Sequence, residues 1–90
     1  MNIKDVLEQA KSQLSEATGL KPITIAEIFK DERGWHVFLD MLEMSRIPTA
    51  TDVLGEYEVI LDSDGKMLSF DRKRTRLRGQ IVERDEKVKM

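Results

Sequence analysis

The fold is decided by the stretch Trp35-His36-Val37-Phe38-Leu39-Asp40-Met41-Leu42-Glu43-Met44. Successive side chains of a β-strand point to opposite faces of the sheet. One face of this strand would carry Trp35, Val37, Leu39 and Met41, and the other would carry His36, Phe38, Asp40 and Leu42. Because apolar residues occur on both faces, the pattern predicts a central strand whose second, mixed face is partly covered or open to a partner.

The residues that follow predict a β-hairpin. Alternation within residues 56–62 is typical of a half-buried strand and places three side chains on one face, Tyr57, Val59 and Leu61. The sequence Asp62-Ser63-Asp64-Gly65 is a turn signal, because glycine adopts a positive φ at little steric cost. Residues 66–70 then return as the next strand, with Leu68 and Phe70 expected to point inward.

The N-terminal third predicts a helix and one more strand. Apolar residues recur at steps of three and four, which indicates an amphipathic helix over residues 3–18 that buries Ile3, Leu7, Ala10, Leu14 and Ala17. Gly19 suits the left-handed conformation that ends a helix, and Pro22 prevents its continuation. Residues 23–30 are rich in β-branched and aromatic residues with imperfect alternation, so we expect a strand that can contain a bulge.

These elements predict an α+β fold in which the N-terminal helix packs on a four-stranded antiparallel meander sheet. The covered face would carry Trp35, Val37, Leu39, Tyr57, Val59, Leu61, Leu68 and Phe70. A basic C-terminal extension follows, and residues 72–78 either continue the last strand or begin a helix capped by Asp71 that uses Leu77, Ile81 and Val88. We expect one domain over residues 1–80 and a charged, fraying tail over residues 81–90.

The composition excludes several kinds of functional site. The 90 residues contain no cysteine, which excludes disulfides, Cys-based zinc sites and thiol catalysis. No apolar run approaches the roughly 18–20 residues that span a bilayer, and the N-terminus lacks a signal-type stretch, so we expect a cytoplasmic protein without a transmembrane segment. His36 is the only histidine, and Asp62-Ser63-Asp64-Gly65 is too short for a calcium loop. We therefore expect no metal, cofactor, catalytic residue or small-molecule substrate.

Charge is distributed unevenly along the chain. Residues 40–64 contain seven acids and one base, Arg46, whereas residues 72–78 contain five bases and no acid. The basic stretch could bind an acidic protein partner, form a solvated strand edge, or pair with the acidic half of the same chain. Nucleic acid is disfavoured, because no aromatic residues are interleaved for base stacking and the net charge is −2.

An ordered series of short motifs runs through the middle of the chain: Gly34-Trp35-His36-Val37, Glu43-Met44-Ser45-Arg46-Ile47-Pro48, Asp52-Val53-Leu54-Gly55-Glu56-Tyr57-Glu58-Val59, and Leu61-Asp62-Ser63-Asp64-Gly65. The basic stretch follows. Over roughly residues 15–80 this order resembles the gas vesicle protein O (GvpO) family. The resemblance implies a non-enzymatic accessory protein, chaperone- or scaffold-like, that is associated with gas vesicles and contacts the shell protein or other accessory proteins.

The candidate contact residues lie in two segments. The connection after the central strand contributes Glu43, Arg46, Pro48 and Asp52, and the basic stretch contributes Arg72, Arg74, Arg76 and Arg78. Glu43 and Arg46 could form a local salt bridge or meet a partner. The alternative function is a small nucleic-acid-binding regulator that uses residues 72–78. A homodimer through the open strand edges is a further alternative.

Overall fold

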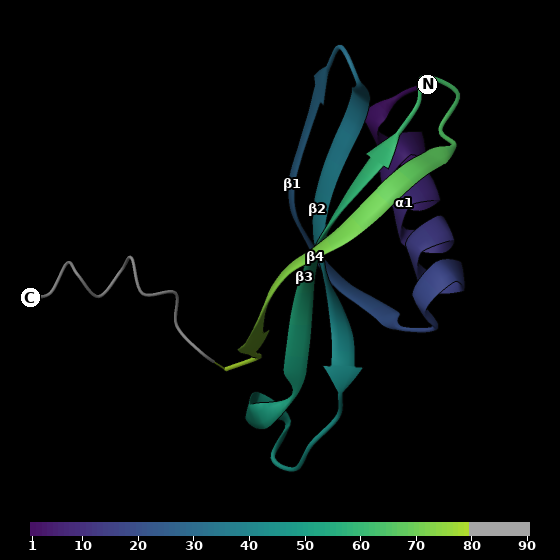
Figure 1. Ribbon diagram of the computed structural model, residues 1–90. Helices are drawn as coiled ribbons and strands as arrows, with labels where there is room; N and C mark the ends of the chain where they lie inside the picture. Colours follow the sequence, from purple (N-terminus) through teal and green to yellow (C-terminus); the bar gives the residue numbers. More distant parts are fainter. Residues whose placement is uncertain (80–90) are drawn as a thin grey trace, which may run out of the picture.

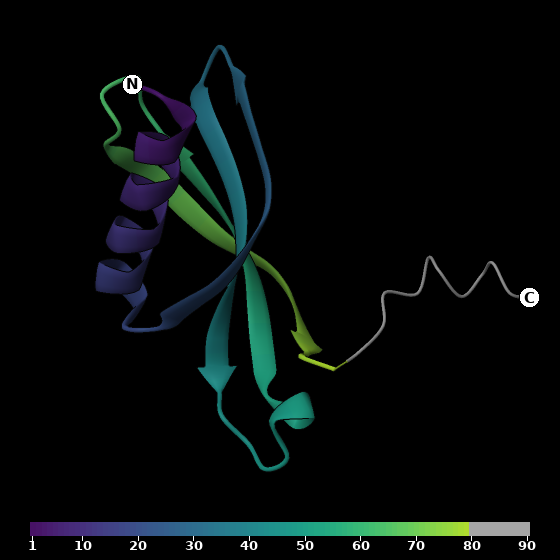
Figure 2. The same cartoon turned by 180° about the vertical axis from the view of Figure 1, so that it is seen from behind.

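The computed structural model describes residues 1–79. The elements are, in chain order, α1 (Ile3–Thr18), β1 (Lys21–Asp31), β2 (Gly34–Met44), the 3-10 helix η1 (Thr49–Thr51), β3 (Val53–Leu61) and β4 (Met67–Leu77). The four strands form one antiparallel sheet in the order β1-β2-β3-β4, and α1 lies against one face of it (Figures 1 and 2). The predicted α+β architecture is confirmed, with β2 in a central position.

Helix α1 begins and ends as its sequence predicts. The side chain of Asn2 accepts a hydrogen bond from the backbone N–H of Asp5 (2.9 Å). Gly19 has a φ of 76°, and its N–H donates to the carbonyl of Ser15. The predicted buried stripe is wrong at both ends, because Val6, Ala10 and Leu14 are buried whereas Ile3 is 53% exposed and Ala17 is exposed. A straight helix on a twisted sheet stays in contact only along its middle turns.

The core lies between α1 and the middle of the sheet. The buried stripe of the helix packs on six side chains that point from β2 and β3 toward it: Val37, Leu39, Met41, Tyr57, Val59 and Leu61. Trp35 is half-buried at the margin of this cluster. The expectation of one apolar face on each of the two central strands is thus confirmed.

Strand β4 contains two bulges that the sequence reading missed. Ser69 lies opposite Ile60 and Met67 lies opposite Leu61, so Leu68 is an extra residue. Leu68 is 57% exposed and Phe70 is 41% exposed, which contradicts their expected inward position. Phe70 stays on the helix-side face opposite Val59 and contacts the ring of Tyr57 (centroids 6.3 Å apart), but the helix does not cover it fully.

Bulges therefore occur in both edge strands. The second bulge of β4 is at Lys73, and β1 has register shifts that leave Ile23 and Ala26 unpaired in its ladder with β2. The bulge allowed in the first strand is confirmed. Such irregularities twist an edge and discourage the addition of another strand.

The basic stretch is part of β4 as far as Leu77. The strand alternative is therefore right, and the helix capped by Asp71 is wrong over these residues, because the sheet ladder already uses their backbone groups. Ile81, Val88 and the predicted tail over residues 81–90 lie outside the described residues. No helix within residues 1–79 is long and apolar enough to cross a membrane.

The sheet is longer than the helix that covers it. Eleven residues of β2 span about 36 Å at about 3.3 Å per residue, whereas the sixteen residues of α1 span about 24 Å. In both views the end of the sheet that carries η1 extends beyond the end of α1 (Figures 1 and 2). The helix-side face is therefore bare of helix at the β2–β3 connection.

Two leucines test this description of the core. Leu39→Ala should lower the free energy of unfolding by about 2–5 kcal/mol, because Leu39 is fully buried between helix and sheet. Leu68→Ala should change it by less than about 0.5 kcal/mol, because Leu68 is an exposed bulge residue. Urea denaturation followed by circular dichroism measures both. Equal losses in the two variants would contradict the bulge assignment.

Candidate interaction site

Five cations near the C-terminal end of the described chain each form an ion pair with a carboxylate. Four of them lie in β4, and the fifth is in the residue that follows the strand. We call Arg72, Lys73, Arg74, Arg76 and Arg78 the cation row. The pairs are Arg72–Glu43 (2.8 Å), Lys73–Glu58 (3.2 Å), Arg74–Glu56 (2.7 Å), Arg76–Asp40 (2.6 Å) and Arg78–Asp52 (3.6 Å). Of the alternatives left open by the sequence, pairing within the chain is therefore observed, and it links β4 to β2 and β3.

The bulge at Lys73 divides the cation row between the two faces of the sheet. Arg72 lies opposite Tyr57, on the face that α1 packs against. Arg74 lies opposite Glu56 and Arg76 opposite Leu54, on the face that carries no helix. A regular strand would place these three arginines on one face, so the bulge gives each face its own cation.

Within every pair the cation is the more exposed partner. The side chains of Arg72, Lys73, Arg74, Arg76 and Arg78 are 51%, 41%, 68%, 32% and 35% exposed, whereas their carboxylates are 17%, 17%, 17%, 7% and 6% exposed. These five pairs are neutral, yet their more exposed members are the guanidinium and ammonium groups, and the ammonium of Lys73 also pairs with the exposed carboxylate of Asp71 (3.2 Å). Such exposed cations attract anionic groups.

Asp52 anchors the connection between β2 and β3. It is 4% exposed, and its Oδ1 accepts a hydrogen bond from the backbone N–H of Arg46 (2.7 Å). Its carbonyl accepts from the backbone N–H of Arg78 (2.8 Å). The Nε of Arg78 is buried without a hydrogen bond in the described part of the chain, and Asp52 Oδ2 lies near it. The structure thus brings three of the predicted contact residues together.

Pro48 and Arg46 lie in the exposed part of this connection. The Ile47–Pro48 peptide is cis, and the carbonyl of Pro48 accepts bonds from the backbone N–H (2.9 Å) and hydroxyl (2.7 Å) of Thr51. The guanidinium of Arg46 contacts the sulfur of Met44 (Nε–Sδ 3.3 Å). Among the described residues Arg46 forms no ion pair with Glu43, so the local salt bridge considered from the sequence is absent there.

Glu43 is turned toward the helix-side face by a bulge in β2. Met44 pairs with Val53 and Leu42 with Leu54, which leaves Glu43 as the extra residue. Its carboxylate accepts from the hydroxyl of Tyr57 (2.8 Å) and from Arg72. Burial and then the neighbouring carboxylate raise the pKa of Tyr57. Gly55 leaves the space for this contact, because a Cβ there would collide with the Glu43 carboxylate.

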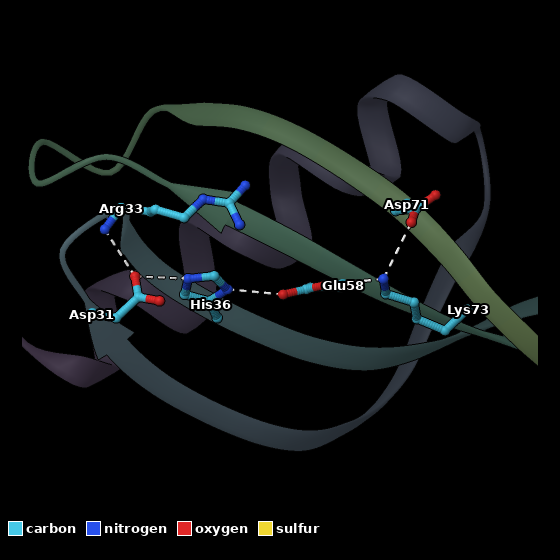
Figure 3. A network of polar contacts seen from close by, with 6 residues as sticks. All are labelled: Asp31, Arg33, His36, Glu58, Asp71 and Lys73. Carbon is cyan, nitrogen blue, oxygen red and sulfur yellow. Dashed lines mark hydrogen bonds and ion pairs between the residues drawn. The ribbon is translucent and has the colours of Figure 1, made fainter.

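His36, the single histidine of the sequence, is the buried centre of a polar network (Figure 3). Its side chain is 4% exposed; Nδ1 lies 2.8 Å from Glu58 and Nε2 lies 2.9 Å from Asp31. The ring stacks on Phe29, with centroids 4.5 Å apart. Both ring nitrogens face carboxylates, and in the protonated ring both can donate to them.

The network also shifts pKa values. The hydrogen bond to Glu58 raises the pKa of His36, with Asp31 adding to the effect against the cost of burial. The bond from His36 lowers the pKa of Glu58, and Lys73 lowers it further. The two carboxylates thus favour the protonated form of the ring.

The sequence contained a signal for the missed acidic partners. Glu56 and Glu58 alternate with Tyr57 and Val59, so they must lie on the face opposite the core. The turn at residues 62–65 places the basic stretch beside them. Reading the two strands as a pair would have predicted cross-strand ion pairs, although not the bulge that selects them.

The fold and the site define a small α+β protein in which β4 is paired to β2 and β3 by a row of cations. The chain belongs to the GvpO family, since the family model described as "Gas vesicle synthesis protein GvpO" matches residues 1–82. The resemblance seen in the sequence motifs is thereby confirmed. This is a family of gas vesicle synthesis and not a known enzyme family.

Curated relatives agree with this membership. The chain is 35% identical to gas vesicle protein O of a Streptomyces species over 75 residues, which cover 83% of this chain and 59% of that protein. Over 53 residues it is 26% identical to gas vesicle protein O1 of Halobacterium salinarum, covering 59% of this chain and 44% of the relative. Haloferax mediterranei gas vesicle protein O is 28% identical over 50 residues, with 56% and 36% covered. The chain thus spans 36–59% of these relatives' lengths. No solved structure matches it.

Arg76 and Arg74 provide a test of the ion pairs. Arg76→Gln should lower the free energy of unfolding by about 1–3 kcal/mol, because it leaves the buried carboxylate of Asp40 without its cation. Arg74→Gln should cost less than about 1 kcal/mol, because that pair is largely exposed on the arginine side. Adding Asp40→Asn to Arg76→Gln should recover most of the loss in urea denaturation. No recovery would contradict pairing as the cause.

His36 should make stability depend on pH. Its raised pKa contributes stability that is complete below about pH 6.5 and lost as pH rises through the folded value. The lowered pKa of Glu58 contributes stability above about pH 4.3 that is lost on acidification. Urea midpoints should therefore be highest between about pH 4.5 and 6.5 and decline above. His36→Gln should remove the alkaline decline. An NMR titration that places the His36 pKa at or below 6.5 would refute this account.

Proposed function

We propose that this chain supports assembly of the gas vesicle shell through protein–protein contacts, as a non-enzymatic, chaperone- or scaffold-like factor that acts in the cytoplasm beside the growing vesicle. Its partners would be the shell protein or other accessory vesicle proteins. Family membership supports the process. The observation that supports the mechanism is the cation row, in which four arginines are more exposed than the carboxylates they pair with.

Pairing within the chain is compatible with partner binding, because arginine has more donors than these pairs use. A guanidinium carries five N–H groups in a planar fork. Arg74 uses Nε for Glu56, and Arg72 uses Nη1 for Glu43. Their remaining donors can bind a carboxylate of a partner while the internal pair stays intact.

The proposed contact residues divide into two groups by exposure. Arg46, Pro48, Arg72 and Arg74 are exposed, which supports direct contact with a partner. Asp52, Glu43, Arg76 and Arg78 are buried or half-buried, which supports a role in holding the connection and β4 in place. A variant in which every cation of the row is changed to glutamate would place acidic side chains next to the partly buried carboxylates. Loss of binding in that variant could then result from unfolding.

The experiment is co-purification of the tagged chain with the other vesicle proteins of its host. The wild type should retain a shell or accessory protein, and the double variant Arg72→Gln/Arg74→Gln should retain several-fold less, since it removes the two most exposed cations of the row. The matched control is Lys4→Gln/Lys66→Gln, which removes the same charge from two exposed sites elsewhere. Circular dichroism verifies that all variants are folded.

Two results would decide against this function. Retention of no vesicle protein by the wild type would remove its support. Binding of duplex DNA, with an affinity that falls steeply between low and moderate salt and that depends on Arg72 and Arg74, would favour the nucleic-acid alternative.

A further inference from the structure

An apolar row lies on the part of the sheet that α1 leaves bare. Met44, Val53 and Leu77 are neighbours across β2, β3 and β4 in one row of the sheet. Met44 is 51% exposed, Leu77 is 42% exposed and Val53 is half-buried. None of the three is among the buried residues of the helix-side core or the partly buried residues packed against it. The row is an additional set of apolar side chains on the sheet.

The row points to the same side of the sheet as the core. Val53 and Tyr57 differ by an even number of positions along β3, so their side chains share a face. Directly opposite residues of an antiparallel pair also share a face, which places Met44 and Leu77 there. Further along this face the sheet is covered by α1. The bare end therefore continues a surface on which a helix already packs.

Ile47 is a further exposed apolar residue close to this row in the chain. It is 99% exposed and follows Met44 by three positions, in the connection that leads from β2 to η1. The connection is fixed by the bond from the Arg46 N–H to the buried carboxylate of Asp52 and by the bond from the Gly79 N–H to the carbonyl of Ala50 (2.9 Å). An isoleucine fully exposed on an anchored turn is pre-positioned, so its burial by a partner costs little ordering entropy.

The sheet edges and the charges around the apolar row indicate which kind of partner segment could bind there. Bulges in both edge strands disfavour the addition of a partner strand, which leaves the face as the route of contact. Beside the apolar row, the carboxylates of Glu43 and Asp52 are less exposed than Arg72 and Arg78, with which they pair. Arg46 stands next to Met44 and forms no ion pair within the described residues. A partner here meets apolar side chains with cations around them.

We propose that the apolar row and Ile47 form a docking surface for an amphipathic helix of a partner protein, one that carries acidic side chains beside its apolar stripe. This helix would extend the layer begun by α1 along the same face of the sheet. The proposal rests on the proposed function, because it names the surface and the kind of segment through which an assembly partner would bind.

The binding test uses a synthetic helical peptide of about 16 residues. It contains leucine at steps of three and four, with alanine elsewhere and glutamate beside the stripe. Two control peptides replace glutamate by lysine or scramble the order. With the isotope-labelled full chain, the glutamate peptide should shift the amide signals of Met44, Ile47 and Val53, and leave those of Phe29 and Phe38 on the other face unchanged.

Variants on the connection have matched controls at the other end of the molecule. Ile47→Ser should weaken binding of the glutamate peptide about tenfold or more, since burying an isoleucine contributes about 1.5–3 kcal/mol. Ile3→Ser changes an isoleucine that is 53% exposed and should have no effect. Arg46→Glu should weaken binding several-fold. Arg33→Glu is its match, because Arg33 also lies in a turn and donates its backbone N–H to an aspartate (2.8 Å), and it should bind as the wild type does.

The outcomes separate this inference from the proposed function. The docking surface is overturned if the scrambled or lysine peptide binds equally well, if the shifts map to the other face, or if Ile3→Ser and Arg33→Glu lose as much affinity as Ile47→Ser and Arg46→Glu. In a host that lacks the chain, vesicles should be absent, return with the wild type and fail to return with Ile47→Ser/Arg46→Glu. Vesicles in the chain-free host would refute the proposed function. Full rescue by the double variant would refute the docking surface alone.

Discussion

Strand β4 is tied to the sheet by a set of ion pairs in addition to its backbone ladder with β3. Of its eleven residues, most are exposed, and Met67 is the one that packs against the core cluster. A strand with so little buried apolar surface gains little from the hydrophobic effect. Five carboxylates on β2, β3 and their connection are 17% exposed or less, and a carboxylate that is partly removed from water needs a cation or hydrogen-bond donor in compensation. The cations of β4 and Arg78 satisfy that requirement, and the backbone ladder adds to it.

This constraint explains the irregular register of β4. Glu43 is paired with a cation on the helix-side face, whereas Asp40 and Glu56 are paired with cations on the opposite face. In a strand with strict alternation, Arg72, Arg74 and Arg76 would all lie on one face, and the carboxylates of the other face would have no arginine beside them. The bulge at Lys73 changes the face of the arginines that follow it, and the bulge at Leu68 moves an apolar side chain into solvent. The same two bulges make the edge a poor template for a further strand.

Much of this structure could be read from the sequence, because its periodic elements are strong. The cap of α1, the turn at residues 62–65 and the apolar alternation of β2 and β3 each have one consistent interpretation. The register of β4 could not be read, because a bulge is one extra residue with no compositional mark. That register determines which side chains are exposed, including Leu68 and Phe70. It also determines on which face of the sheet each arginine lies. The burial of His36 was missed for a related reason, since its partners come from a turn and from a neighbouring strand. The family resemblance came from the order of the motifs, and the family match confirms it.

The choice of arginine in the cation row has a physical consequence that lysine would not reproduce. Lys73 is the one ammonium in the row, and it lies between Asp71 and Glu58, both 3.2 Å away. These two carboxylates raise the pKa of Lys73, Asp71 more strongly than Glu58. Because the ammonium group of Lys73 already contacts two carboxylates, it is less available to bind a carboxylate of a partner. An arginine bonds a carboxylate through one edge of its planar group and keeps other N–H donors directed outward. Four of the five members of the row are arginines. A row of this composition can hold β4 in the sheet and bind an acidic partner with the same side chains, so stability and recognition need not compete for the same donors.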